Sequence, residues 1–502
     1  MRTFSLIVIF ICLQALSSDA QISSRGWHRD LLDSLEWRYQ SKGAKYHSVF
    51  QPQVPLLKAS DFDTCDSVSR SLIVDAAPLL SARAGAGVNG KALWSLAVGA
   101  LMGIKDHHRW DGEFSYTFNQ FYGPNYLNQR TDSINVFPGV GKLEKNENFG
   151  YYFAHQFAGH LGYRAGDHFY FEVRNGKHFL GDGYRSLILS DNAPAYPYGK
   201  MVLDVWRVRF QSLFAQCVAG DEKKYFATHA LSWNVTDRFQ LSFFEMVVCQ
   251  AKDSLNNLNL EFHYLNPLLV YRPLEYAQGS ADNVILGAGF KHRPTNQFHW
   301  YAQLVLDEFL LSELSNQTGW WANKFGGQIG FRYFNLLPGF SVQSEFNAVR
   351  PFTYSHGSEI QAWGHYNQAL AHPLGANFWE WSTMLSYRLS DNYFITNKFL
   401  WSSYGRDIDL YGDGVVDNLG GDIFRSYVNP YQERENVLLQ GNRSVLHFNE
   451  FKIHRHIKKV PGMVCSLGYL ARMEKNQGSW QNDHYLLFSI GMQGLLESVT
   501  DY

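Results

Sequence analysis

Residues 297–307 read QFHWYAQLVLD, and this stretch decides the fold class. Apolar side chains occupy every second position: Phe298, Trp300, Ala302, Leu304 and Leu306. More polar side chains fill the positions between them: Gln297, His299, Tyr301, Gln303 and Asp307. Because successive side chains of a strand point to opposite faces, this alternation predicts a strand with one apolar face and one wet face.

The same period of two recurs in residues 113–119, 340–347 and 485–496. These segments approach the length of about ten residues that a tilted strand needs to cross a hydrocarbon layer. Turn-forming residues fall between such segments, for example at 175–176 (NG) and 293–296 (RPTN). The pattern predicts an all-β fold over residues 78–502. We expect a transmembrane antiparallel β-barrel of about 16–18 strands, with ordered loops or small helices partly filling or capping the lumen.

The composition agrees with strands that face lipid on one side. Charged residues make up 18% of the chain, against about 25% in soluble domains, and aromatic residues reach 16%. After Ala20 no stretch approaches the roughly 18 consecutive apolar residues of a membrane-spanning helix. A soluble β-sandwich or propeller is the alternative, but no repeat of propeller length is visible. The net charge of −2 gives no reason to expect nucleic acid as a partner.

The N-terminus has the build of a secretory signal peptide over residues 1–20. Arg2 supplies the positive charge, residues 4–16 are apolar except for Ser5 and Gln14, and residues 18–20 (SDA) form a small-x-small cleavage site. Residues 21–77 are polar and mixed, which predicts a periplasmic or plug-like segment. An exported barrel of this kind belongs in the outer membrane of a Gram-negative cell, in contact with its lipid.

Several blocks resemble the Wzi-type capsule-assembly family of outer-membrane proteins. They are residues 181–194 (GDGYRSLILSDNAP), 264–267 (YLNP), 271–276 (YRPLEY) and 280–283 (SADN). Residues 350–356 (RPFTYSH) and 364–377 (GHYNQALAHPLGAN) look like the branch that contains the RemB-type gliding-motility proteins of the Bacteroidetes. The resemblance covers roughly residues 75–502. It implies an outer-membrane barrel that binds surface polysaccharide in the capsule branch, or serves motility and adhesion in the gliding branch.

The block at 350–377 also concentrates candidate ligand-binding side chains. These are His356, His365, Tyr366, Asn367, Gln368 and His372, flanked by Trp363 and Trp379. Sugar recognition uses this mixture of flat apolar faces and neutral polar groups. Asp307, Glu345 and Arg350 join the candidates from strand or loop ends. The alternative for the block at 350–377 is that its groups tie a long loop to the barrel wall, since buried polar groups need hydrogen bonds. The alternative for Asp307, Glu345 and Arg350 is that they brace a plug or tune selectivity. Both interpretations stay open at this stage.

The sequence predicts neither a metal, nor a cofactor, nor a catalytic centre. The spacing of the three histidines matches no metal motif, and the acidic stretch from Asp413 to Asp417 lacks the closing Glu of an EF-hand. A barrel hydrolase would need a nucleophile held against a base. Ser355 and His356 are adjacent in the chain, which does not make a dyad, and a G-x-S-x-G elbow is absent from the sequence.

We therefore expect a non-enzymatic protein that binds or organises surface polysaccharide, or supports gliding motility or adhesion. Motility or capsule-export machinery would then be a further partner. The alternative is an outer-membrane diffusion channel or transporter. The lumen distinguishes the two: inward-folded segments at 256–283 and 350–377 favour binding, whereas an open bore favours a channel.

Overall fold

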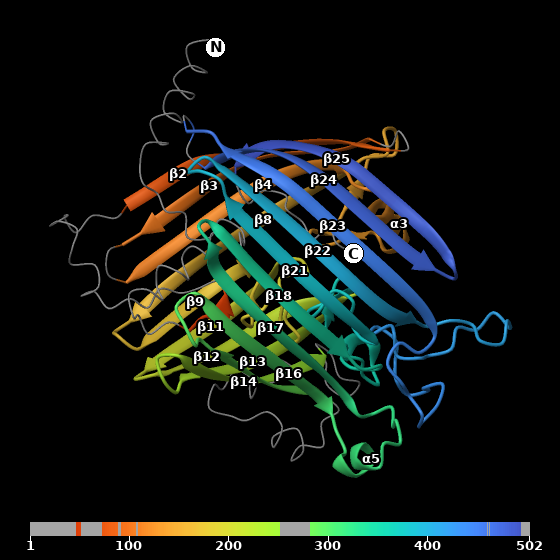
Figure 1. The fold of residues 1–502 in the computed structure, drawn as a ribbon. Coiled ribbons are helices and arrows are strands. Elements are labelled where there is room, and N and C mark those ends of the chain that lie inside the picture. The colour runs from red at the N-terminus through yellow and green to blue at the C-terminus, as the bar shows by residue number, and fades with distance from the viewer. Residues whose placement is uncertain are drawn as a thin grey trace.

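The computed structural model describes residues 47–51, 73–88, 92–106, 109–250, 282–458, 460 and 462–492. Within this part of the chain, 18 long antiparallel strands form one closed barrel (Figure 1). The strands are β2 (Ile73–Gly87), β3 (Ala92–Lys105), β4 (Trp110–Tyr122), β8 (Tyr152–Ala165), β9 (Phe169–Gly176), β11 (Tyr196–Val205), β12 (Val208–Ala219), β13 (Glu222–Asn234), β14 (Phe239–Gln250), β15 (Asn283–His292), β16 (Phe298–Glu308), β17 (Lys324–Leu337), β18 (Phe340–Val349), β21 (Phe378–Arg388), β22 (Tyr393–Arg406), β23 (Asn442–His456), β24 (Met463–Asn476) and β25 (Ser479–Met492). The predicted fold class and strand number are confirmed.

The barrel closes where its last strand meets its first. β25 pairs with β2 in antiparallel register, with Ala84 opposite Phe488, so the sheet has no open edge in the described residues. Short connections, such as residues 206–207 and 338–339, lie at the end where β2 begins and β25 finishes, which we call the turn end. The opposite end, which we call the loop end, carries the long connections: residues 123–151, 177–195, 309–323, 350–377 and 407–441. Among the described residues, no helix has the length and apolar character needed to cross a membrane.

The two faces of the strands differ as the alternation predicts. On β16, Leu304 is exposed on the outside, whereas His299, Tyr301 and Gln303 are buried toward the lumen. On β25, Leu486 is exposed and its neighbour Tyr485 is buried. An apolar exterior around a largely polar interior is the distribution expected when lipid surrounds the barrel.

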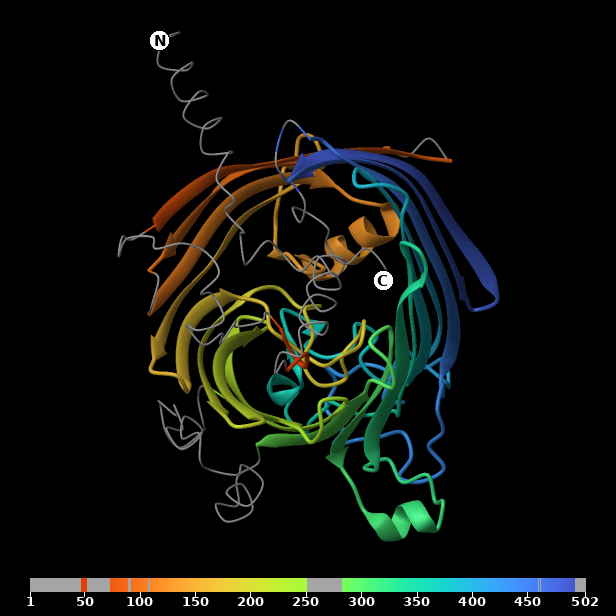
Figure 2. The same cartoon turned by 60° about the vertical axis from the view of Figure 1, so that its left-hand side comes forward.

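Two loops from the loop end fold into the lumen, and together we call them the plug: residues 177–195 and residues 350–377 (Figure 2). The first contains β10 (Phe179–Leu180), which pairs with β1 (Phe50–Gln51). The second contains the short helix η4 (Glu359–Gln361) and a hairpin of β19 (Gly364–His365) and β20 (Gln368–Ala369). The expectation that ordered loops partly fill the lumen is confirmed.

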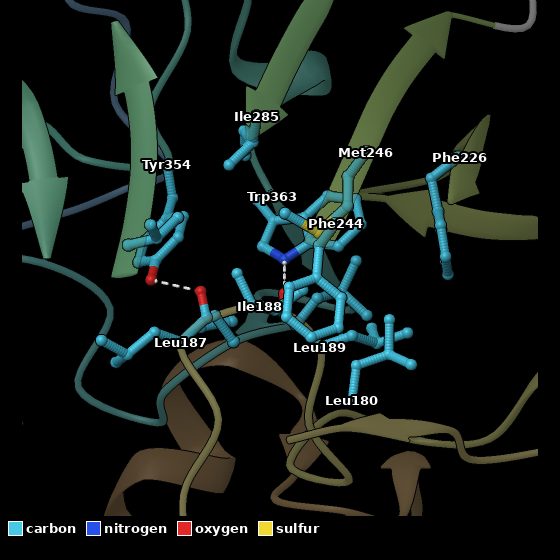
Figure 3. Close-up of a cluster of buried hydrophobic side chains, with 14 of the residues drawn as sticks. Leu180, Leu187, Ile188, Leu189, Phe226, Phe244, Met246, Ile285, Tyr354 and Trp363 are labelled. Carbon is cyan, nitrogen blue, oxygen red and sulfur yellow. Dashed lines mark hydrogen bonds between the residues drawn. The ribbon is translucent and has the colours of Figure 1, made fainter. Parts of the chain in front are cut away.

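An apolar run holds the plug together. Leu187, Ile188 and Leu189 are completely buried. The Trp363 indole donates a hydrogen bond to the Ile188 carbonyl at 2.7 Å, and the Tyr354 hydroxyl donates to the Leu187 carbonyl at 2.7 Å (Figure 3). Inward side chains of the barrel wall complete this core: Phe226, Phe244, Met246 and Ile285. The run therefore joins both halves of the plug to the wall.

The other side of the lumen holds the loop at 123–151. Its helix α3 (Asn125–Ile134) starts after Pro124 and ends at Asn135, whose φ of 53° is left-handed. Two short pairings follow, β5 (Val136–Phe137) with β6 (Gly141–Lys142), and β7 (Glu144–Lys145) with the start of β8. Leu127 of α3 packs with inward leucines of β22, β23 and β24 in a second core. A further helix, α5 (Leu311–Ser315), protrudes from the barrel at the loop end (Figure 1).

Some boundaries differ from the sequence-based expectation. β2 begins at Ile73, earlier than the expected start at Pro78. The turn predicted at Asn175 and Gly176 is wrong: both residues belong to β9 and pair with β11, because neighbouring strands outweigh a local turn preference. The signal peptide, most of residues 21–77 and residues 256–281 lie outside the described residues.

Candidate functional site

The structure places four of the predicted ligand-binding residues on the β19–β20 hairpin. Tyr366 and Asn367 form its two-residue turn, with φ values of 49° and 52°, as a type I′ turn requires. The His365 Nδ1 accepts a hydrogen bond from the Val218 N–H at 3.0 Å. The Gln368 Oε1 accepts one from the Gly139 N–H at 2.9 Å. The hairpin is thus fixed to β12 on one side and to the α3 loop on the other.

Two further histidines lie on the second half of the plug. His372 is completely buried, with its Nε2 3.0 Å from the Glu380 Oε1, and Arg185 Nε donates to the same oxygen at 3.1 Å. His356 is half-buried and packs edge-on against the Tyr427 ring, with 5.4 Å between the centroids. Burial lowers the pKa of His356 to about 4, so its imidazole is neutral at physiological pH.

Glu345 is the main anchor for the first half of the plug. Its carboxylate accepts hydrogen bonds from the backbone N–H groups of Tyr184 and Arg185, at 2.6 and 2.8 Å. The Tyr301 hydroxyl donates to the same carboxylate at 2.9 Å. These hydrogen bonds to Glu345 form inside the barrel, where a backbone N–H group without an acceptor would destabilise the folded protein.

Asp307 and Arg350 anchor the second half of the plug. The Asp307 carboxylate accepts a hydrogen bond from the Tyr354 N–H at 2.8 Å and lies 3.4 Å from the Lys324 ammonium group. The Arg350 guanidinium lies over the Phe325 ring, 5.3 Å from its centroid, and donates to the Trp320 carbonyl at 3.5 Å.

The nine predicted residues therefore divide unequally. Asn367 is exposed and Tyr366 is half-buried at the tip of the hairpin. Most of the other residues are buried, and their polar atoms form hydrogen bonds with the plug or the barrel wall. The alternative interpretation, in which these groups tie a long loop to the barrel, accounts for their contacts. A ligand contact at any of them stays a prediction.

A different site opens beside α3 at the loop end. It is a hollow of about 860 Å³, which we call the aromatic hollow, within the size range of small-ligand sites. Its lining residues are Ala92, Trp94, Tyr122, Asn128, Asp132, Lys145, Phe149, Gly150, Tyr151 and Tyr152. Five of these are aromatic. They come from the ends of β3, β4 and β8 and from the loop before β8.

Ring contacts set the shape of the aromatic hollow. Trp94 meets Tyr151 edge-to-face, with 5.5 Å between the centroids, and Phe149 stacks on Tyr151 at 6.3 Å. Phe149 is 78% exposed. A large apolar ring held open to solvent is typical of a binding surface rather than of a packed core.

Polar groups also line the aromatic hollow. The Lys145 ammonium group and the Tyr152 hydroxyl both donate to the Asp132 Oδ1, each at 2.7 Å. These hydrogen bonds, first that from Lys145, lower the pKa of Asp132, so the carboxylate is charged. The Asp132 and Lys145 side chains remain 50% and 38% exposed. They can therefore offer hydrogen bonds to a ligand lying against the rings.

Sequence reasoning missed the aromatic hollow because its residues are scattered along the chain from Ala92 to Tyr152. The available signal was the aromatic run at 149–153 (FGYYF), which follows a Gly-Pro break at 123–124. A strand with consecutive aromatic residues places rings on both faces. The rings that point into the barrel then need other groups to pack against. Among the described residues, no group of His, Cys, Asp and Glu side chains is arranged to hold a metal ion.

Comparisons with known proteins bear on the fold. No family model matches the chain, and no curated protein sequence matches it. Among solved structures, the chain is similar to Wzi of Escherichia coli, an outer-membrane carbohydrate-binding β-barrel involved in group 1 capsule assembly. The TM-score is 0.55 at 10% identity, over 92% of this chain and 98% of Wzi. OpdK and OprD of Pseudomonas aeruginosa follow with TM-scores of 0.45 and 0.43, at 8% and 9% identity, over 83% and 85% of this chain and 98% and 96% of theirs.

The closed barrel and the similarity to Wzi define the class of protein: the fold is that of an outer-membrane β-barrel. Within this class, the chain has a Wzi-like barrel, as the resemblance in its sequence implied. The identity is too low for the comparison to show more than the fold. The comparisons offer no support for the gliding-motility branch.

Proposed function

We propose that the protein is a non-enzymatic outer-membrane barrel that binds a surface polysaccharide at its loop end. The observation that carries this proposal is the aromatic hollow, which five aromatic rings line together with the charged, partly exposed Asp132 and Lys145. Pyranose rings present C–H faces that stack on aromatic side chains, and their hydroxyls bond to groups such as Asp132 and Lys145.

Two further observations support the proposal. Bacterial barrels keep short turns in the periplasm and long loops outside, so the loop end with the aromatic hollow would face the cell exterior. The plug also occupies much of the lumen, which suits a binding protein better than a wide diffusion channel. Wzi, a barrel of similar fold, binds carbohydrate.

The cellular role depends on what the bound polysaccharide is attached to. A polysaccharide held at the outer end of a barrel would be anchored to the cell surface, as in capsule assembly. A role in gliding motility or adhesion would use the same contact against a substrate, and would need motility or export machinery as a second partner.

The test is a glycan array probed with detergent-folded protein. We expect saturable binding to at least one polysaccharide. The Trp94→Ala, Tyr151→Ala double variant should weaken that binding about tenfold or more, because it removes two stacking faces. Tyr411→Ala is the matched control, since Tyr411 is 71% exposed on a different loop at the same end.

Equal binding by the double variant and the wild type would move the site away from the aromatic hollow. No binding to any glycan, together with steady conductance in a planar bilayer, would replace the proposal with a diffusion channel.

A further inference from the structure

A cluster of arginines lies on the other face of α3. Tyr126 and Arg130 are four residues apart on the helix, whereas Asn128 and Asp132 of the aromatic hollow fall on the opposite face. Arg472 of β24 reaches the Tyr126–Arg130 face from the barrel wall, and Arg406 of β22 lies beside it. The Arg472 guanidinium lies over the Tyr126 ring, 4.4 Å from its centroid. We call Arg130, Arg406 and Arg472 the arginine cluster.

One carboxylate serves two members of this cluster. The Glu474 carboxylate accepts from the Arg406 Nη2 at 2.6 Å and from the Arg472 Nη2 at 2.9 Å, and also from the Tyr404 hydroxyl at 2.5 Å. Asp483 stands opposite Arg472 in the register of β24 and β25, but it forms no ion pair with Arg472. Its Oδ2 accepts instead from the Gln481 side chain at 3.3 Å.

The cluster therefore has more donors than the protein satisfies. Arg472 is 5% exposed, and its Nε and Nη1 have no acceptor in the described part of the chain. Buried guanidinium donors without acceptors are costly and rare. Because Arg406 and Arg472 donate to the same carboxylate, their charges lie close enough to repel one another.

Two members of the cluster are exposed to solvent. Arg406 is 45% exposed, and Arg130 is also exposed. A flat anion with two oxygens matches the fork of donors on a guanidinium group, and a carboxylate has this shape. The aromatic hollow and the arginine cluster lie on opposite faces of the single helix α3. A chain of sugars that crosses this helix can therefore contact both sites.

We propose that the arginine cluster binds the carboxylate of an acidic polysaccharide, while the aromatic hollow holds a neighbouring sugar ring. This inference rests on the proposed function and adds the chemical class of its ligand, a polymer that contains uronic acids. The carboxylate supplies acceptors to Arg472 and offsets the repulsion between the arginines.

The test compares carboxylated glycans with their methyl esters on the same array, in a zwitterionic detergent at low salt. Oligogalacturonate and its methyl ester are the reference pair, because esterification removes the charge and keeps the sugar. We expect binding to carboxylated members and a loss of about tenfold or more on esterification. Sulfated glycans on the same array distinguish a carboxylate site from a general anion site, which would bind both equally and overturn the carboxylate assignment.

The variant for this test is Arg130→Gln, Arg406→Gln, which spares the buried Arg472 and so protects folding. We expect it to lose the preference for the acid form while neutral glycans bind as before. Arg434→Gln is the control, since Arg434 is 54% exposed at the loop end and pairs with Glu313 elsewhere. Equal binding of acid and ester by the wild type, or an unchanged acid preference in the double variant, overturns this inference and leaves the proposed function standing. No glycan binding at all overturns both.

Discussion

At the scale of single residues, the polar groups inside the barrel act mainly as anchors. Glu345 shows this role clearly, because its carboxylate receives two backbone N–H groups of the plug and one tyrosine hydroxyl. Gly183 lies close beside it: a Cβ at this position would be 2.7 Å from the Glu345 Oε2 and 2.7 Å from the Arg185 carbonyl. The glycine is therefore required by a close approach of the plug to the wall.

Replacing Glu345 with alanine should release residues 181–190 from the wall. The Tyr184 and Arg185 N–H groups would lose their acceptor, at a cost of about 1–3 kcal/mol each. We expect faster hydrogen exchange in the 181–190 segment, with the barrel strands unchanged. Ser341→Ala, on the same strand near the turn end, is the control. Unchanged exchange in the Glu345→Ala variant would show that the apolar run alone holds the plug.

At the scale of elements, the β19–β20 hairpin depends on a neutral histidine. Burial lowers the pKa of His365 to about 4, from an ordinary value of 6.5. The docked hairpin thus favours neutral imidazole, which accepts the Val218 N–H. When the hairpin is undocked, the imidazole regains its ordinary pKa and takes up a proton more readily.

The docking of this hairpin should therefore depend on pH with a defined sign. Its stability is full above about pH 6.5 and is lost as the pH falls toward about 4, by at most about 3 kcal/mol. Hydrogen exchange at 364–370, corrected for the intrinsic rate, should speed up over this window. His365→Asn keeps an acceptor without a proton to gain, and should flatten most of the dependence. The remainder would come from His356, whose pKa is also about 4. An equal dependence in wild type and variant would assign the effect to other groups.

At the scale of the whole molecule, the lumen is built as a core rather than as a bore. The plug packs with inward side chains of β11 to β16, β18 and β21 in one cluster. Helix α3 packs with side chains of β3, β4, β8 and β22 to β25 in another. Figure 2 shows both sets of loops within the ring of strands.

The intact protein should therefore give no steady conductance in a planar bilayer. Replacing residues 182–190 by a Gly-Ser linker of equal length removes the buried run of Leu187 to Leu189, and should open a measurable current. The same replacement at 411–416, on an exposed loop at the loop end, is the control. Steady current through the wild-type protein would contradict the filled lumen.

The sequence by itself determined the class of fold and which face of a strand points toward the lipid. Alternation at 297–307 predicts both the strand and its lipid-facing side, because a period of two is a local property that survives in any sheet. The low charge and the aromatic content also indicate contact with lipid, because composition does not depend on how distant segments meet. The sequence also marked residues 181–194 and 350–377 as unusual blocks, although it could not say that they meet inside the barrel.

Only the tertiary structure decided what those blocks and the scattered aromatic residues do. The same mixture of His, Asn, Gln and Trp suits a sugar or a hydrogen-bonded plug, and which of these holds depends on whether the polar atoms find protein partners. For His365 and Glu345 they do, through contacts with residues more than 140 positions away. Trp94 and Tyr151, in contrast, share a site only because β3, β4 and β8 are adjacent in the closed sheet. Contacts between distant segments arise from strand order and loop folding, which no local pattern encodes.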